Sequence, residues 1–283
     1  MKKICFLALM CFSLTQVKAQ KGVVFKIKYL PNHDYKTSVT SDVKFNVNLT
    51  GDQELIDKLN SQGITNPVNA NLSVGLNGDT KTGAMGADKS FPLKMDYKIS
   101  NISVTANGKQ MPIPPKVTEK DLKMVGHISE DWKLKIDSAD GKVVVDSTEK
   151  KMQQMMDLFQ KQIQFPDKAL KPGDTFTQGS PMDIPITQGQ SIHIDAGVTY
   201  KLVSISDGKA YFELVPNFSM NFQIKTVTVN VSGTGTGKMV YDVKNNFPLS
   251  KDGIINMKIK VTSNKLNVDG TAVVNTKYSC TIN

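Results

Sequence analysis

Apolar and polar residues alternate with a period of two along most of the chain. The pattern is clearest at 43–49, 255–261 and 278–282, where every second residue is apolar. Because successive side chains of a strand point to opposite faces of a sheet, each run predicts a half-buried β-strand. Weaker runs predict further strands at 198–205, 211–215 and 222–231. The chain is therefore predicted to be mainly β.

Six Asn-Gly or Asp-Gly dipeptides punctuate this pattern. Such pairs accept left-handed backbone conformations and are a strong signal for a two-residue hairpin turn. They are Asn77-Gly78, Asn107-Gly108, Asp140-Gly141, Asp207-Gly208, Asp252-Gly253 and Asp269-Gly270. Hairpins pair strands antiparallel, so we expect a curved antiparallel sheet or half-barrel.

Helical periodicity occurs at two places. Asp146 followed by Glu149 resembles a capping box, and it precedes one apolar helical stripe made of Met152, Met155, Met156, Phe159 and Ile163. This predicts a main amphipathic helix at about 147–164, packed on the apolar face of the sheet. A shorter helix is predicted at 53–62, ending at Gly63. We expect one β-rich domain at 20–283, with two sheet segments at about 20–146 and 165–283, flanking the main helix, as the alternative.

The first nineteen residues are typical of a signal peptide. Lys2 and Lys3 precede an apolar stretch that is too short to span a bilayer, and the pattern predicts cleavage between Ala19 and Gln20. Met10 is a poor residue before a lipid-modified cysteine, so a lipid anchor at Cys11 is disfavoured. The mature chain is expected to be exported, periplasmic or secreted, and soluble, with no transmembrane span. Its one remaining cysteine, Cys280, lies on the apolar face of a predicted strand, which indicates a buried, inert thiol.

All 35 basic residues are lysine, and the formal net charge is +9. Arginine supplies the bidentate contacts that proteins use for phosphates and guanine bases. Its absence excludes the usual chemistry of sequence-specific nucleic-acid binding, and the lysines form no basic run. A solvated lysine-rich surface is the simplest interpretation, with attraction to an anionic membrane surface as the alternative.

The stretch SGTGTGK at 232–238 resembles a phosphate-binding loop but lacks three features that such a loop requires. The spacing of the glycines is one residue short, Met239 replaces the expected Ser or Thr, and no helical pattern follows. The stretch instead continues one long strand, in which Gly233, Gly235 and Gly237 share the apolar face. Glycine inside a strand marks a close approach to the backbone. We expect helix packing or a bend of the sheet there, with space for a ligand as the alternative.

The sequence offers little that would support catalysis. His33, His127 and His193 are isolated, with no second ligand at metal-binding spacing. There is no nucleophile elbow and no activated cysteine. We therefore expect no enzyme activity, no cofactor and no metal.

The phrase FPDKALKPGDTF at 165–176, the glycine-containing strand and the segment YDVKNNFPLSKDG at 241–253 resemble an uncharacterised family of exported bacterial envelope proteins. The resemblance covers mainly residues 160–262 and implies a β-rich protein without an assigned activity. The layout is also similar, more faintly, to periplasmic lipoprotein carriers, in which a curved sheet shelters acyl chains. Those carriers rely on an arginine in the cavity, which this chain lacks.

Two functions follow from these expectations. The first is an exported, non-enzymatic envelope protein that binds an apolar or lipid-like ligand between helix and sheet. The alternative is a structural or interaction module with a fully packed core and an envelope protein as partner. The expected lining of the ligand site is Met152, Met155, Met156, Phe159, Ile163, Gly233, Gly235 and Gly237.

Overall fold

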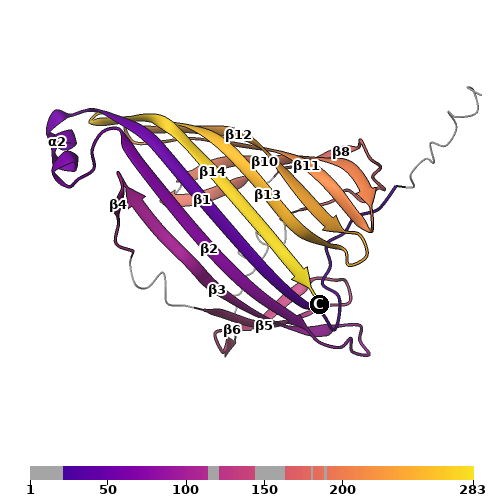
Figure 1. The fold of residues 1–283 in the computed structure, drawn as a ribbon. Coiled ribbons are helices and arrows are strands. Elements are labelled where there is room, and N and C mark those ends of the chain that lie inside the picture. Colours follow the sequence, from indigo (N-terminus) through magenta and orange to yellow (C-terminus); the bar gives the residue numbers. More distant parts are fainter. Residues whose placement is uncertain (1–21, 114–120, 144–162, 180, 188–189) are drawn as a thin grey trace, which may run out of the picture.

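The computed structural model describes residues 22–113, 121–143, 163–179, 181–187 and 190–283. Their strands form one antiparallel sheet, which confirms the mainly β prediction. Figure 1 shows the strands as a curved surface with a short helix at one end. The elements are β1 (Asp34–Gly51), α2 (Gln53–Ser61), β2 (Val68–Thr82), β3 (Phe91–Ala106), β4 (Lys109–Gln110), β5 (Leu122–Ile128), β6 (Leu134–Ala139), β7 (Lys142–Val143), β8 (Thr175–Gly179), β9 (Met182–Thr187), β10 (Gln190–Ser206), β11 (Lys209–Ile224), β12 (Val227–Asp242), β13 (Phe247–Thr262) and β14 (Leu266–Ile282).

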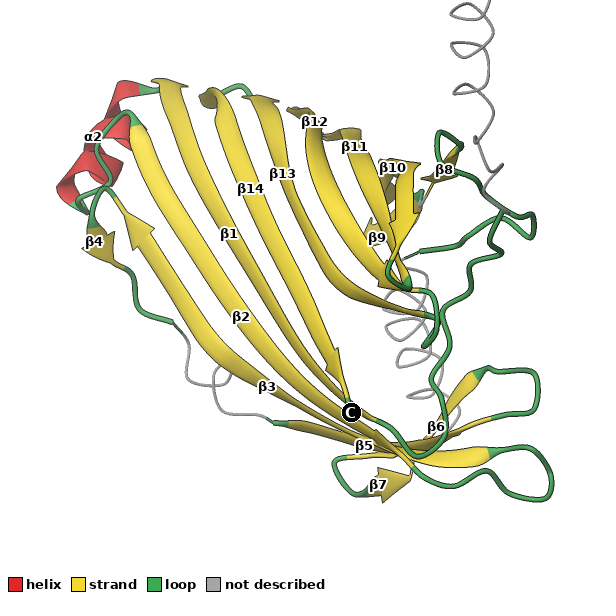
Figure 2. Cartoon of the chain, turned by 45° about the vertical axis from the view of Figure 1, so that its right-hand side comes forward, coloured by secondary structure: helices red, strands yellow, loops and turns green. Residues whose placement is uncertain are grey.

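The strand order places the first and last strands, β1 and β14, side by side near the centre of the sheet. The order is β7-β6-β5-β3-β2-β1-β14-β13-β12-β11-β10-β8, with β4 beside β3 and β9 beside β10. β1 pairs with β14 from Tyr35 opposite Ile282 to Gly51 opposite Leu266. The segments before and after the predicted main helix therefore contribute to one continuous sheet (Figure 2). In the described part of the chain, β7 and β8 are its two ends.

The hairpin turns were predicted only in part. Asn107-Gly108, Asp140-Gly141 and Asp207-Gly208 have positive φ at both residues, as a two-residue hairpin turn requires, and connect successive strands. The predicted turns at 77–78, 252–253 and 269–270 are wrong, because these dipeptides lie inside β2, β13 and β14. Two of these glycines are needed for close approach. A Cβ at Gly78 would lie 2.4 Å from Cε1 of Tyr97, and one at Gly270 would lie 2.3 Å from the carbonyl oxygen of Asn46.

The short helix is confirmed. α2 begins after Asp52, whose side chain accepts a hydrogen bond from the backbone N–H of Leu55, and Gly63 follows it with a φ of 84°. The main helix predicted at 147–164 lies outside the described residues except for Ile163 and Gln164, which have no regular secondary structure. The predicted signal peptide at 1–19 also lies outside them.

Register separates the sheet into an apolar and a polar face. In β1, the apolar residues in phase with Tyr35 are half-buried, except for the buried Leu49, whereas the lysines and asparagines between them are exposed; the half-buried ones are Val39, Val43, Phe45 and Val47. Pairing carries the same phase into the neighbouring strands. We call the side that contains Tyr35 the inner face and the opposite side the outer face.

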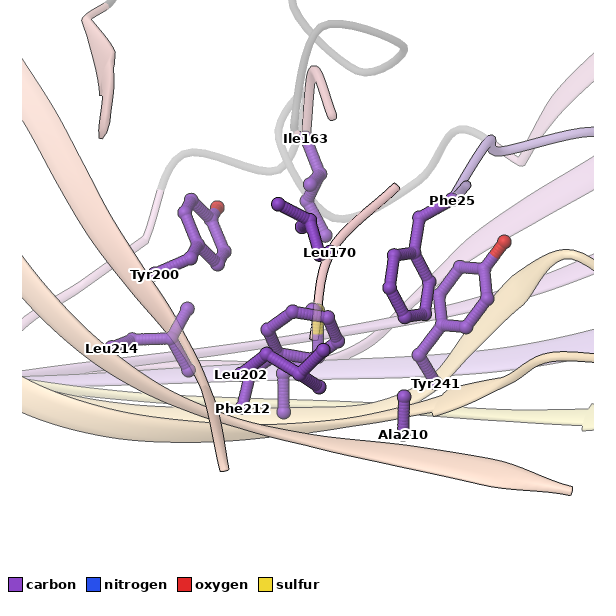
Figure 3. Close-up of a cluster of buried hydrophobic side chains, with 10 residues drawn as sticks. Phe25, Ile163, Leu170, Tyr200, Leu202, Ala210, Phe212, Leu214 and Tyr241 are labelled. Carbon is purple, nitrogen blue, oxygen red and sulfur yellow. The ribbon is translucent and has the colours of Figure 1, made fainter. Parts of the chain in front are cut away.

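The buried core lies at one end of the inner face, opposite α2. It consists of three clusters, which are centred on Phe212 and Tyr241, on Phe91 and Met124, and on Tyr35 and Phe247. Figure 3 shows the first cluster, in which Phe25, Leu170 and Ile163 lie against side chains of the sheet. We call this the core end and the end that carries α2 the distal end.

The N-terminal segment, residues 22–30, links all three clusters. Phe25 belongs to the first cluster, Ile27 packs against the first and third, and Tyr29 packs against the second and third. The segment is also held by polar contacts, because Val23 exchanges backbone hydrogen bonds with Leu170 and the Tyr241 hydroxyl donates to the carbonyl oxygen of Lys26. Apolar and polar residues alternate along the N-terminal segment, and its apolar side chains pack against the core end of the sheet.

We expect Phe25→Ala to lower the free energy of unfolding by about 3–5 kcal/mol, the usual cost of removing a buried phenylalanine. The Phe25 side chain is 2% exposed, and its ring centroid lies 5.2 Å from that of Phe165 and 5.2 Å from that of Tyr241. Urea denaturation followed by tryptophan fluorescence and circular dichroism measures the change. Val24→Ala is the matched control, because Val24 is 46% exposed and its truncation should cost little. Equal effects of the two variants would contradict the assigned packing.

Candidate functional site

The glycine-containing stretch lies in β12, with the parity that the sequence predicts. Gly233, Gly235 and Gly237 are in phase with Met239 and Tyr241, which are both 1% exposed and belong to the first cluster. The alternate residues of β12 from Asn230 to Lys238 are exposed on the outer face. The inner face of β12 is therefore bare of side chains over three successive inward positions.

The backbone of β13 lies where side chains at these glycines would be. A Cβ at Gly235 would lie 1.8 Å from the carbonyl oxygen of Ile254, and one at Gly237 would lie 2.4 Å from that of Asp252. At Gly233 the nearest atom would be the carbonyl oxygen of Asn256, at 2.9 Å. The close approach thus comes from the neighbouring strand, in keeping with a local bend of the sheet. The predicted packing of the main helix against these glycines lies outside the described residues.

We expect Gly235→Ala to destabilise the protein by about 2–3 kcal/mol or more, because the methyl group would overlap a backbone carbonyl that cannot rotate away. Gly253→Ala is the matched control on the adjacent strand. The nearest atom to a Cβ at Gly253 is the carbonyl oxygen of Thr236 at 3.6 Å, an ordinary contact, so the expected change is below about 1 kcal/mol. Thermal unfolding of both variants measures the difference. A Gly235→Ala protein as stable as the control would disprove the close approach.

The apolar inner face continues past the core toward the distal end. Most of its side chains there are half-buried, Leu49 and Ala272 are buried, and none belongs to the three clusters. They include Val43, Phe45 and Val47 of β1, Phe218, Met220 and Phe222 of β11, and Met257, Ile259 and Val261 of β13. We call this surface the distal apolar face. Large contiguous apolar surfaces are uncommon on folded proteins and usually mark a binding site.

Lys251 is the one charged residue among the inward positions of β13. Register places it opposite Met239 of β12 and Tyr278 of β14, in phase with Gly253, Ile255 and Met257. Its ammonium lies 6.0 Å from the centroid of the Tyr200 ring, and among the described residues it has no carboxylate partner. Burial lowers the pKa of Lys251, because an apolar environment disfavours the charged form.

Lys251 was missed in the sequence because Asp252-Gly253 suggested a turn. A strand that began after Gly253 would leave Lys251 in a loop. The available signal was its spacing, since Lys251 is in phase with Ile255, Met257 and Ile259 along one uninterrupted strand. The neighbouring tyrosines cannot supply a charge at neutral pH, because burial raises the pKa of Tyr200 to about 12 and also raises that of Tyr278.

The expected lining residues are only partly placed. Met152, Met155, Met156 and Phe159 lie outside the described residues. Ile163 is 6% exposed and is packed in the first cluster. The three glycines are on the inner face, between this cluster and the distal apolar face. Cys280 is buried, as predicted, and burial raises the pKa of its thiol.

The histidines remain separate in space. His127 and His193 each lie 3.1 Å from one carboxylate, of Asp137 and Asp195, and Nδ1 of His33 lies 2.7 Å from the carbonyl oxygen of Pro31. Within the described ranges, no group of three or more His, Cys, Asp or Glu side chains is arranged to hold a metal ion.

The outer face is polar and carries two shallow grooves. One groove, of about 490 Å³, crosses β11 to β14 beside Glu213, Lys238, Asp252 and Lys277, which alternate in charge along one row. The other, of about 710 Å³, is lined mainly by asparagine, serine and lysine side chains nearer the distal end.

Two facing carboxylates on the outer face also escaped the sequence analysis. Asp79 of β2 is paired with Asp96 of β3, and each has one buried carboxylate oxygen with no hydrogen-bond partner among the described residues. Lys36 and Lys123 occupy the same row on either side. Like charges directly opposite each other are unfavourable in a sheet, and the flanking lysines offset this repulsion.

Comparisons with known proteins add little to this geometry. No family model matches the chain, and no curated protein matches it. A crystal structure of OccK5 (OpdH) from Pseudomonas aeruginosa is similar over 87% of this chain and 98% of that one, at 8% identity and a TM-score of 0.19. A similarity this low carries no argument. Among the described residues, no helix is long and apolar enough to cross a membrane.

Proposed function

We propose that this protein is an exported, non-enzymatic envelope protein that binds an apolar or lipid-like molecule on the inner face of its sheet. The observation that carries the proposal is the distal apolar face, where inward side chains of β1, β11 and β13 remain half-buried beyond the core. Fully packing these side chains would stabilise the fold by roughly 1 kcal/mol or more for each large residue. A surface that forgoes this stabilisation is suited to receive an apolar partner.

The shape of the surface supports a flexible, elongated ligand. From Gly253 to Val261, β13 presents alternate apolar side chains over a length of about 26 Å, at the usual rise of 3.3 Å per residue. Met257 and Met220 lie on this surface, and methionine adapts to varied apolar partners. The core end is closed by the N-terminal segment and the three clusters. A ligand would therefore lie along the strands, beyond the core end.

The first test is extraction of the protein as the cell makes it. We expect the mature chain, purified from its native cells without detergent, to yield a stoichiometric apolar compound by mass spectrometry of an organic-solvent extract. An extract without such a compound would overturn the proposal. It would favour a structural or interaction module of the envelope, which in-cell crosslinking to a reproducible protein partner would then support.

We expect Phe222→Glu to reduce the bound compound severalfold, because an unpaired carboxylate on the apolar surface costs free energy that ligand binding must overcome. Phe222 is an inward, half-buried residue of β11. Asn221→Glu is the matched control, because Asn221 is the exposed outward neighbour on the same strand. The amount of compound per protein is quantified for both variants, with urea midpoints as a check of folding. Equal retention by the two proteins would exclude the inner face as the binding surface.

A further inference from the structure

Lys251 introduces a charge at the border between the core and the distal apolar face. Tyr200, whose ring lies 6.0 Å from the ammonium, shares a cross-sheet row with Leu214, Gly237 and Gly253. This row is one inward position nearer the distal end than Lys251 itself. The ammonium therefore lies over the inner face next to a ring of the first cluster. The row of Tyr200 contains Gly237 and Gly253, so β12 and β13 present no side chain to the inner face in that row.

The local chemistry leaves this cation without compensation. Its paired neighbours across the strands are Met239 and Tyr278, and the described residues place no carboxylate within ion-pair distance of it. A distant aromatic ring compensates a half-buried ammonium only weakly. Because an uncompensated charge in apolar surroundings is costly, such groups are normally paired. The outward lysines of the same strand, Lys258 and Lys260, are exposed and incur no such cost.

We propose that Lys251 binds the anionic group of a single-chain fatty acid whose acyl chain lies along the distal apolar face. This inference rests on the proposed function and specifies its ligand. One ammonium balances one negative charge, which fits a carboxylate. A phosphate monoester carries about −1.5 to −2 at neutral pH and would leave part of its charge unpaired in an apolar site. The acyl chain would pass Gly237 and Gly253 and then lie against the inward side chains of β13, which are Ile255, Met257 and Ile259.

The test compares four sixteen-carbon probes on the delipidated mature protein: palmitate, hexadecanol, hexadecyl phosphate and hexadecylamine. We expect wild-type protein to bind palmitate roughly tenfold to a hundredfold more tightly than hexadecanol, the range given by one charge-assisted contact. Palmitate should also exceed hexadecyl phosphate, and hexadecylamine should bind most weakly. Isothermal titration calorimetry measures the dissociation constants. Because this comparison uses no variant, it stands even if a substitution disturbs folding.

Lys251→Met then removes the charge and keeps an extended apolar side chain. We expect it to reduce palmitate affinity roughly tenfold or more and to leave hexadecanol affinity unchanged, while Lys251→Arg retains the preference for palmitate. Lys258→Met is the matched control, because it removes an exposed outward lysine seven residues further along the same strand. The Lys251→Met protein should also be at least as stable as wild type, since it lacks an unpaired charge in half-buried, apolar surroundings.

The outcomes separate the two proposals. If wild-type protein binds palmitate and hexadecanol equally, and Lys251→Met changes neither, the role of Lys251 is overturned while the apolar binding function stands. A preference for hexadecyl phosphate over palmitate would overturn the carboxylate ligand. If wild-type protein binds none of the four probes, the proposed function itself fails, and this inference fails with it.

Discussion

The pairing of β1 with β14 is the interaction on which the rest of the structure depends. It joins residues near the two ends of the described chain along seventeen paired positions, from Tyr35–Ile282 to Gly51–Leu266. Every other long strand is added outward from this central pair by an antiparallel neighbour. Because the first and last strands must meet before the sheet is continuous, we expect folding to be slow compared with proteins of local topology.

The sheet supports two different environments on one face. At the core end, the N-terminal segment and residues around Leu170 supply a second layer, which allows aromatic side chains such as Phe25 and Tyr241 to be fully buried. At the distal end, the described residues form no such cluster, and the same alternation leaves apolar side chains half-buried. The strands are held there by backbone hydrogen bonds and cross-strand contacts. The proposed ligand site is a consequence of this uneven covering.

The glycines of β12 and Lys251 of β13 lie at the boundary between these two environments. Gly235 and Gly237 have no room for a Cβ because the backbone of β13 approaches them, so the surface remains bare for a structural reason. The ammonium of Lys251 lies near the Tyr200 ring at the end of this stretch, without a carboxylate partner among the described residues. In the proposed site, the apolar face would hold the acyl chain and Lys251 would supply the specificity.

Sequence alone determined several strands with their apolar phase, α2 and the burial of Cys280, because these depend on local periodicity and capping. The strand predicted at 222–231 is wrong, because β11 ends at Ile224 and β12 begins at Val227, with Lys225 at a positive φ between them. It failed at Asp252-Gly253 and Asp269-Gly270, where turn chemistry was overridden by long paired strands. The site was predictable only as a bare stretch in β12. Only the tertiary structure decided that β13 approaches those glycines and that Lys251 faces inward, since both depend on register between strands, and register is set by pairing across the whole sheet.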